Sequence, residues 1–174
     1  AKIIDLTFLK KDATIEDFQK VAQEAKEYGF RGFCVFPEHT KDAKKVLEGS
    51  GVKVITLVDE PTGSSPHEVR VNTVKKAWSD GSDEVDAVMK IDDFKNKKYE
   101  EVLADLKEIC GLGPTKIIIG SGYLTDEEIK KASQLVREAG AICVKTATID
   151  DPLDVSELQE KAKQPSLRPG REPV

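Results

Sequence analysis

Two charged side chains interrupt apolar runs that otherwise have the composition of buried strands. Lys145 lies within AICVKTA (141–147), and Asp86 lies within EVDAVMK (84–90). Neither residue type is often buried without a partner or a chemical role. A carboxylate close to a desolvated amine is the minimum equipment for Schiff-base chemistry, in which the lysine attacks a carbonyl and the acid moves protons. A second interpretation stays open: a strand-end lysine that reaches solvent, or a plain buried ion pair.

Successive residues of a strand face opposite sides, so position in each run predicts which side chains face the interior. Lys145 alternates with Val144 and Thr146, and we expect the set that contains Lys145 to face inward. Asp86 and Lys90 have the same parity on their own run. We therefore expect Lys90 near this centre, where it either neutralises Asp86 or places a second cation beside Lys145.

The two charged runs belong to a regular alternation of strand-like and helix-like segments. The apolar runs that predict strands cover residues 3–9, 30–36, 52–58, 84–90, 115–120 and 141–147. Thr14 and Thr125 are expected N-caps of the helices that follow the first and fifth runs, and Pro66 is expected at the first helical position after the third. Such alternation predicts an α/β fold with a parallel sheet and helices packed outside it.

Two architectures fit about six parallel β/α units: a doubly wound sheet, or an incomplete TIM-type (β/α) barrel. No glycine-rich phosphate loop follows the first strand, which weakens the dinucleotide-binding form. We expect one β/α domain over residues 1–163, whose last helix covers 151–163. An irregular proline-rich tail is expected over 164–174.

Polar residues recur where the predicted strands end, which is where barrel enzymes keep their chemistry. The candidate substrate-binding residues are Lys90, Ser121, Thr146 and Thr148. Cys34 on the second strand is a further candidate, although a small buried hydrophobe is the alternative interpretation of each cysteine.

Composition excludes several classes of function. Charged residues make up 34% of 174 residues and give a net charge of -5, which provides no electrostatic case for nucleic acid or an anionic membrane. No apolar run approaches the roughly 20 residues that span a bilayer.

The three cysteines show no metal-ligand spacing, so we expect no metal and no cofactor. A cytoplasmic location and an organelle matrix or stroma both stay open, because the sequence begins at Ala1 and a leader peptide can have been removed.

Several stretches together resemble the deoxyribose-phosphate aldolase family, whose members are class I Schiff-base aldolases with a (β/α)₈ barrel. IDLT (4–7) looks like the family's I-D-H-T, and VKTAT (144–148) is similar to its V-K-T-S-T. Between them, EAKEYGFRGFCVFP, GSGVKVITLV, GSDEVDAVMK and LTDEEI follow the family's order and spacing. The resemblance implies that Lys145 is the Schiff-base lysine and that Asp86 is the proton-relay aspartate. It also implies a small phosphorylated aldehyde as the ligand.

The sequence departs from that family at positions that matter for turnover. Leu6 stands where the family has histidine, Gly120 where it has glutamate, and Ala147 where it has serine. Ile149 replaces a glycine that lets backbone approach a phosphate. These departures favour a catalytically degenerate protein kept as a structural or interaction subunit. The alternative is an active aldolase that cleaves 2-deoxyribose 5-phosphate to glyceraldehyde 3-phosphate and acetaldehyde.

Six units do not close an eight-strand barrel, so the first and sixth strands would be open apolar edges. Open strand edges invite pairing with other chains. We therefore expect a protein partner, or self-association, to cover these two strands.

Overall fold

Six parallel strands form one curved sheet in the part of the chain that the structure, a computed structural model, describes, residues 2–148. The strands are β1 (Asp5–Thr7), β2 (Gly32–Val35), β3 (Lys53–Val58), β4 (Glu84–Val88), β5 (Thr115–Ile118) and β6 (Cys143–Lys145). Their spatial order is β1-β2-β3-β4-β5-β6, and each neighbouring pair is parallel. The incomplete TIM-type barrel predicted from the sequence is confirmed, and the doubly wound alternative is excluded because the strand order does not reverse.

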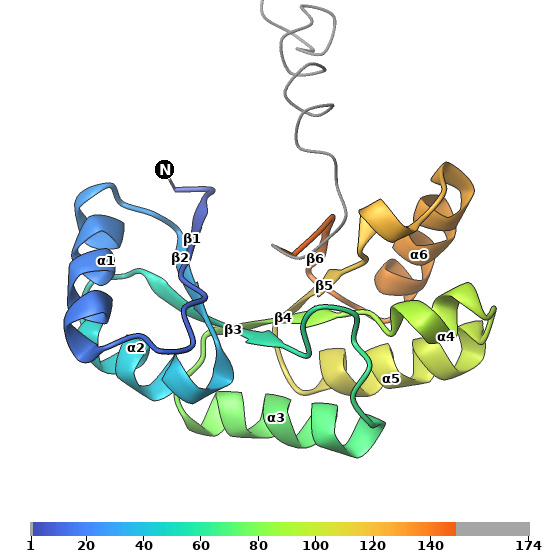
Figure 1. Ribbon diagram of the computed structural model, residues 1–174, viewed down its shortest axis with the longest axis horizontal. Coiled ribbons are helices and arrows are strands. Elements are labelled where there is room, and N and C mark those ends of the chain that lie inside the picture. The colour runs from blue at the N-terminus through green and yellow to red at the C-terminus, as the bar shows by residue number, and fades with distance from the viewer. Residues whose placement is uncertain (1, 149–174) are drawn as a thin grey trace, which may run out of the picture.

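Helices cover the outer, convex side of this sheet (Figure 1). They are α1 (Ile15–Glu27), α2 (Thr40–Val46), α3 (His67–Ser79), α4 (Ile91–Lys95), α5 (Tyr99–Gly111) and α6 (Asp126–Glu138), with short 3₁₀ turns η1 (Pro37–His39) and η2 (Ser121–Tyr123). The five-residue helix α4 was not expected from the sequence. The expected last helix and the boundary at residue 163 lie outside the described residues, so the domain division stays a prediction.

Local signals explain where several helices begin. The Thr14 hydroxyl accepts a hydrogen bond from the backbone N–H of Asp17, and the Asp17 carboxylate accepts one from the N–H of Thr14. Thr125 and Glu128 make the same reciprocal pair at the start of α6. Both expected N-caps are confirmed, whereas Pro66 is the N-cap of α3 and not its first helical residue.

The buried hydrophobic residues form three groups. One lies between α1, α2 and the first three strands, and includes Phe18, Phe33 and Val54. The second lies beneath α3, α5 and α6. The third occupies the concave side of the sheet and consists of Cys34, Ile55, Leu57, Val88, Ile91 and Ile118. These six residues line the concave side of the sheet near the carboxyl ends of the strands. Lys145 and Asp86 point to the same side of the sheet.

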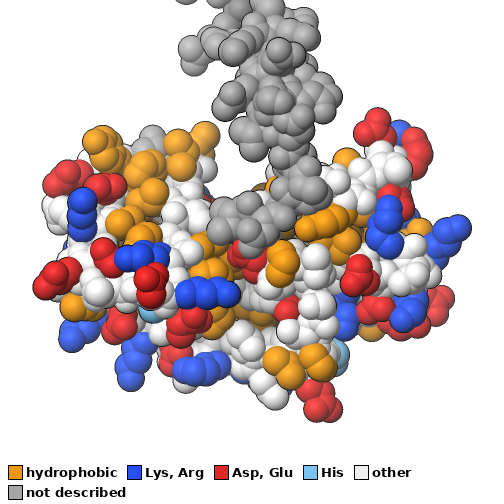
Figure 2. All heavy atoms as spheres, viewed as in Figure 1, with side chains coloured by type: hydrophobic (Ala, Val, Ile, Leu, Met, Phe, Trp, Pro, Cys, Tyr) orange, Lys and Arg blue, Asp and Glu red, His pale blue; other side chains and the backbone are white. Residues whose placement is uncertain are grey.

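The two edge strands of the sheet carry exposed apolar side chains. Ile4, next to β1, is 51% exposed, and Ile142, next to β6, is 53% exposed. Val144 within β6 is 38% exposed, although α6 contacts this strand. Hydrophobic side chains are visible on both sides of the opening in Figure 2.

Gly63 joins the loop after β3 to the end of β4 by a close backbone approach. Its φ is +68°, and a Cβ at this position would lie 2.4 Å from the carbonyl oxygen of Met89. We expect Gly63→Ala to lower the free energy of unfolding by about 2–3 kcal/mol, from backbone strain plus overpacking. Urea unfolding followed by circular dichroism measures this change.

Gly49 provides a matched control for that substitution. Its φ is +70°, but nothing lies within 4 Å of an added Cβ. Gly49→Ala should therefore show the strain alone, at about 1 kcal/mol. Equal losses in the two variants would show that the approach to Met89 has no energetic consequence.

Candidate functional site

Lys145 and Asp86 meet on the concave side of the sheet, as their strand positions predicted. The Lys145 Nζ lies 2.5 Å from Asp86 Oδ2. Asp86 is fully buried, whereas the Lys145 side chain is 29% exposed. The strand register explains the meeting, because β5 lies between their strands and pairs Lys116 with Asp86 and Ile118 with Lys145.

A second lysine, Lys116 on β5, holds the other oxygen of Asp86. Its Nζ lies 3.1 Å from Asp86 Oδ1, 2.9 Å from Asp5 Oδ2 and 3.0 Å from Glu84 Oε2. Burial lowers the pKa of the Lys116 ammonium group, but the charge of Asp86 and the hydrogen bonds to Asp5 and Glu84 outweigh it and hold this pKa above its usual value. Lys116 is therefore a fixed cation that orients Asp86.

Two of these carboxylates, Asp5 and Glu84, also contact cations at the amino ends of the strands. Lys53 Nζ lies 2.6 Å from Glu84 Oε1, and Arg31 pairs with both Glu84 and Asp5. We call the following set the inner charge cluster: Asp5, Arg31, Lys53, Glu84, Asp86, Lys116 and Lys145. With every member charged, it holds four cations and three carboxylates, so the loss of one proton leaves the charges balanced.

Exposure and pairing distinguish the two lysines that contact Asp86. Lys116 is 6% exposed and shared by three carboxylates, whereas Lys145 contacts Asp86 alone among the partners that the described residues provide. A nucleophile must reach its substrate and give up a proton. Lys145 is the member of this pair that is accessible and that has a single carboxylate partner among the described residues.

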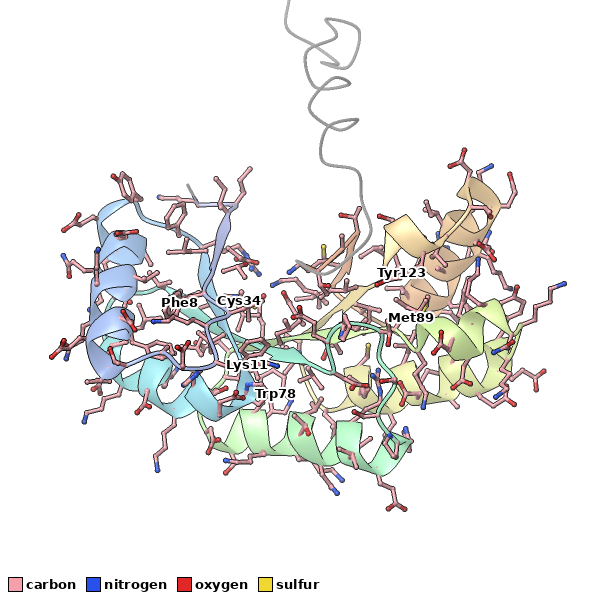
Figure 3. The ribbon with its side chains drawn as sticks, in the orientation of Figure 1. Phe8, Lys11, Cys34, Trp78, Met89 and Tyr123 are labelled. Carbon is pink, nitrogen blue, oxygen red and sulfur yellow. The ribbon has the colours of Figure 1, made fainter. Side chains whose placement is uncertain are left out.

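A pocket of about 250 Å³ opens beside Lys145. Its walls are Thr7, Leu9, Cys34, Leu57, Ile118, Lys145, Ala147 and Thr148. Cys34, whose side chain is labelled in Figure 3, is 2% exposed. Burial, with a smaller contribution from Asp86, raises the pKa of the Cys34 thiol to about 12, so Cys34 is a neutral wall of this pocket.

The structure brings some of the other predicted site residues to this pocket and not others. Thr148 lines it together with Cys34. Ser121 donates its backbone N–H to the carbonyl oxygen of Thr146 at 2.7 Å, which ties η2 to the residue after β6, but neither residue lines the pocket. The roles of all four as substrate-binding residues stay predictions.

Lys90 lies elsewhere, so the expectation that its ammonium group sits beside Asp86 or Lys145 is wrong. Its Nζ lies 3.3 Å from the carbonyl oxygen of Ser65 and 3.6 Å from Asp93 Oδ2. It lines a separate groove together with His67 and Asp105. The physical reason is that β4 ends at Val88 and Lys90 is already the N-cap of α4, where strand parity no longer applies.

Sequence reasoning missed Lys116 as a site residue. A usable signal was present, because Lys116 lies within the apolar run TKIIIG as Lys145 lies within AICVKTA.

Gly120, which ends this run, has a φ of +66°, and a Cβ there would lie 2.4 Å from Ile91 Cδ1. The glutamate that the deoxyribose-phosphate aldolase family has at this position would therefore fit only after a shift of Ile91.

Glu84 gives the inner charge cluster a measurable acid dependence. Burial raises the pKa of Glu84, but hydrogen bonds from Lys53, Arg31 and Lys116 outweigh it and lower the pKa from 4.5 to about 2. The unfolded chain therefore binds a proton at this group before the folded protein does. We expect the free energy of unfolding to fall by a few kcal/mol as the pH decreases from about 4.5 toward about 2.

Urea unfolding at successive pH values tests this dependence. Glu84→Gln should flatten the decline, because the group that takes up the proton is gone. Glu138→Gln, at an exposed ion pair with Lys107, should keep the wild-type slope. An unchanged slope in Glu84→Gln would show that other carboxylates cause the acid sensitivity.

Residues 2–148 were compared with the requirements of a membrane-spanning helix and of a metal site. None of the helices there is sufficiently long and apolar to span a bilayer. No group of three or more His, Cys, Asp or Glu side chains in this region is arranged to hold a metal ion.

Comparison with known proteins shows which family this chain resembles. Residues 1–164 match the model of the DeoC/LacD family aldolases. The chain is 44% identical over 155 residues to deoxyribose-phosphate aldolase of Thermococcus kodakarensis, covering 85% of this chain and 69% of that protein. It is 41% identical over 150 residues to deoxyribose-phosphate aldolase of Metamycoplasma arthritidis, covering 84% of this chain and 69% of that protein.

Solved structures give the same result at the level of the fold. A putative deoxyribose-phosphate aldolase from Coccidioides immitis superposes with a TM-score of 0.80 at 33% identity, and 84% of this chain spans 59% of that chain. The structure described as "QR15, an Aldolase" superposes with a TM-score of 0.82 at 33% identity over 91% of this chain and 73% of its own. The chain therefore belongs to the DeoC/LacD family of aldolases.

Proposed function

We propose that Lys145 binds the carbonyl group of a small aldehyde as an imine, with Asp86 moving the protons. The observation that carries this proposal is the 2.5 Å contact between Lys145 Nζ and Asp86 Oδ2 at the wall of an open pocket. A lysine placed only for structure would be expected to have its ammonium group shielded, as that of Lys116 is.

The chemistry requires only groups that the site holds. Asp86 accepts a proton from the Lys145 ammonium, and the free amine attacks the carbonyl carbon while the carbonyl electrons move to oxygen. That oxygen then takes one proton from the attacking nitrogen and one from the protonated Asp86, so it leaves as water, Asp86 returns to the carboxylate, and the product is the protonated imine. Lys116 stays protonated beside Asp86 and so favours the return of Asp86 to its carboxylate form.

We propose further that retro-aldol turnover by this chain is weak and that the protein acts as a degenerate aldolase, kept as a structural or interaction subunit. Turnover also requires an anchor for the substrate phosphate. Support comes from the replaced residues Leu6, Gly120, Ala147 and Ile149, and from a pocket whose walls carry no charge besides Lys145 among the residues described.

The competing proposal is an active aldolase that cleaves 2-deoxyribose 5-phosphate to glyceraldehyde 3-phosphate and acetaldehyde. The retained Lys145–Asp86 pair and relatives named deoxyribose-phosphate aldolase favour it. The chain covers 69% of the length of each of those two relatives.

One experiment separates these proposals. The protein is incubated with 2-deoxyribose 5-phosphate and cyanoborohydride, followed by intact mass and peptide mapping, beside a turnover assay for released aldehyde. We expect a weak adduct at Lys145 and little release. Rapid cleavage that Lys145→Leu abolishes would establish the active aldolase, and no adduct at Lys145 with any aldehyde would reject both proposals.

The exposed edge strands support self-association of this chain. Apolar surface is unfavourable in water at roughly 25 cal/mol per Å², and β1 and β6 each leave one backbone edge unpaired within residues 2–148. A relative from Aeropyrum pernix has a structure described as tetrameric. We expect wild-type protein to form dimers or larger species in sedimentation velocity, and Val144→Lys to shift it toward monomer.

Val69 on α3 is the control for that shift. It is an exposed hydrophobic side chain, 51% accessible, that lies away from both edge strands. Val69→Lys should sediment like the wild type. A wild-type chain that stays monomeric at all concentrations would show that the edges do not drive association.

A further inference from the structure

His67, the first residue of α3, lies between two carboxylates of α5, the helix that packs beside it (Figure 1). Its Nδ1 lies 2.8 Å from Asp105 Oδ1, and its Nε2 lies 2.8 Å from Glu108 Oε2. An ionised carboxylate only accepts hydrogen bonds, so the two contacts together require a proton on each ring nitrogen. The arrangement therefore fits an imidazolium cation that joins α3 to α5.

The two carboxylates that hold His67 differ in their freedom to move. Asp105 is 3% exposed, and its Oδ2 lies 3.0 Å from Nη2 of the fully buried Arg70. Arg70 also donates to the carbonyl oxygen of Val88 at 2.7 Å, which links Asp105 to the end of β4. Glu108 is 52% exposed, so water can replace its contact with His67. Asp105 is thus a fixed acceptor, and Glu108 is a movable one.

The charges around His67 favour its cationic form. The charged groups that face it are Glu101, Asp105 and Glu108 from α5, Lys90 and Asp93 from the start of α4, and Arg70 from α3 itself through Asp105. Four carboxylates thus face two cations. Hydrogen bonds to Asp105 and then to Glu108 raise the pKa of the His67 imidazole above its ordinary value, and burial opposes them only in part.

We propose that His67 is a pH-operated clasp between α3 and α5, in which the imidazolium ring holds both carboxylates and the loss of one proton releases Glu108 alone. A neutral imidazole has one N–H, so one of the two contacts must be given up. The contact with Asp105 is kept, because a buried carboxylate that faced a ring lone pair would lose a donor that water does not readily replace. The neutral ring therefore carries its proton on Nδ1 and presents Nε2 to the separate groove.

The clasp makes stability depend on pH on the alkaline side of neutrality. The folded chain binds the His67 proton more tightly than the unfolded chain, in which the pKa has its ordinary value of 6.5. The stabilisation is therefore complete below about pH 6.5 and is lost as the pH rises through the higher pKa of the folded state. The acid dependence of Glu84 has the opposite sign and a lower pH range, so the two groups can be measured separately.

Imidazole ¹⁵N NMR spectra of the full chain, recorded from about pH 5.5 to about pH 9.5, test the clasp. The chain has two histidines, so the spectrum of His67→Gln assigns the remaining signals to His39. We expect His67 to titrate above its ordinary value and to carry its proton on Nδ1 when neutral. A neutral ring protonated on Nε2, a mixture of both tautomers, or a midpoint at or below about 6.5 would overturn the proposal.

Glu108→Gln tests which carboxylate is released. The glutamine amide can donate to Nε2 of the neutral ring, so we expect the His67 midpoint to shift to lower pH while the proton of the neutral ring stays on Nδ1. Glu100→Gln is the control, because Glu100 lies on the same helix but lines a different groove. Its His67 midpoint should equal that of the wild type. An unchanged midpoint in Glu108→Gln would show that Glu108 does not hold the imidazolium ring.

Urea unfolding at about pH 6 and about pH 9 measures the energetic effect of the clasp. The His67 side chain is 41% exposed, so His67→Gln carries little risk to folding. Between the two pH values, we expect the unfolding equilibrium constant of the wild type to rise about threefold more than that of His67→Gln, which is the scale of one exposed ion pair. Equal rises in the two proteins would show that His67 does not clasp the helices in a proton-dependent way.

Discussion

Replacing Asp86 by asparagine is expected to slow the appearance of a reduced adduct at Lys145 by about 100-fold, the lower end of the range for the loss of a positioned acid–base group. The carboxylate lies 2.5 Å from Lys145 Nζ and is fully buried, so water does not readily replace it as the proton acceptor. Asparagine keeps the shape of the side chain but cannot take up the ammonium proton. The measurement is the rate of adduct formation with acetaldehyde, by mass spectrometry of the Lys145 peptide.

Asp93→Asn serves as the control for this substitution. Asp93 also pairs with lysines, Lys90 and Lys98, but it lies in the separate groove and does not contact Lys145. Its adduct rate at Lys145 should equal that of the wild type. Circular dichroism establishes that both variants are folded. An unchanged rate in a folded Asp86→Asn protein would show that Asp86 is a structural partner and not a proton acceptor.

Replacing Lys116 by methionine is expected to lower the free energy of unfolding by about 3–5 kcal/mol, because removal of one partner leaves buried charges uncompensated. Lys116 contacts Asp5, Glu84 and Asp86 at once and is 6% exposed. Methionine has similar length and no charge, so the loss comes from the three carboxylates and not from a cavity. Urea unfolding at pH 7 measures the change.

Lys107→Met tests whether the effect depends on burial. Lys107 pairs with Glu138 at the surface, where the two side chains are 51% and 57% exposed. Exposed pairs contribute only about 0–1 kcal/mol, so this variant should unfold close to the wild type. If Lys116→Met also lost less than about 1 kcal/mol, Arg31, Lys53 and Lys145 would be sufficient to neutralise the cluster.

The parallel sheet and the meeting of Lys145 with Asp86 were predictable because both depend on regular alternation. Six apolar runs separated by helical segments lead to one parallel sheet, and side-chain parity holds throughout a strand. Lys90 shows the limit of that reasoning. The run EVDAVMK continues to Lys90 in the sequence, but the strand ends at Val88, and parity cannot be extended past the last strand residue.

Other features depend on contacts between distant segments, which no local pattern records. Arg70 is fully buried because Asp59 and Asp105 lie on either side of it, and Asp105 is 35 residues away. Lys116 reaches Asp5 across 111 residues, and the register of the four strand pairs from β1 to β5 brings them together. The composition of the pocket likewise follows from register, since its walls come from several strands and the residues that follow them.

The central claim, that Lys145 is an imine-forming lysine, is tested most directly by peptide mapping after reductive trapping of wild-type protein and Lys145→Arg. Arginine retains a cation beside Asp86 but does not form an imine under these conditions. We predict an adduct with acetaldehyde that is concentrated at Lys145 in the wild type and absent from that peptide in the variant, while adducts at exposed lysines such as Lys130 are equal in both. An adduct at Lys145 no greater than that at Lys130 would contradict the claim.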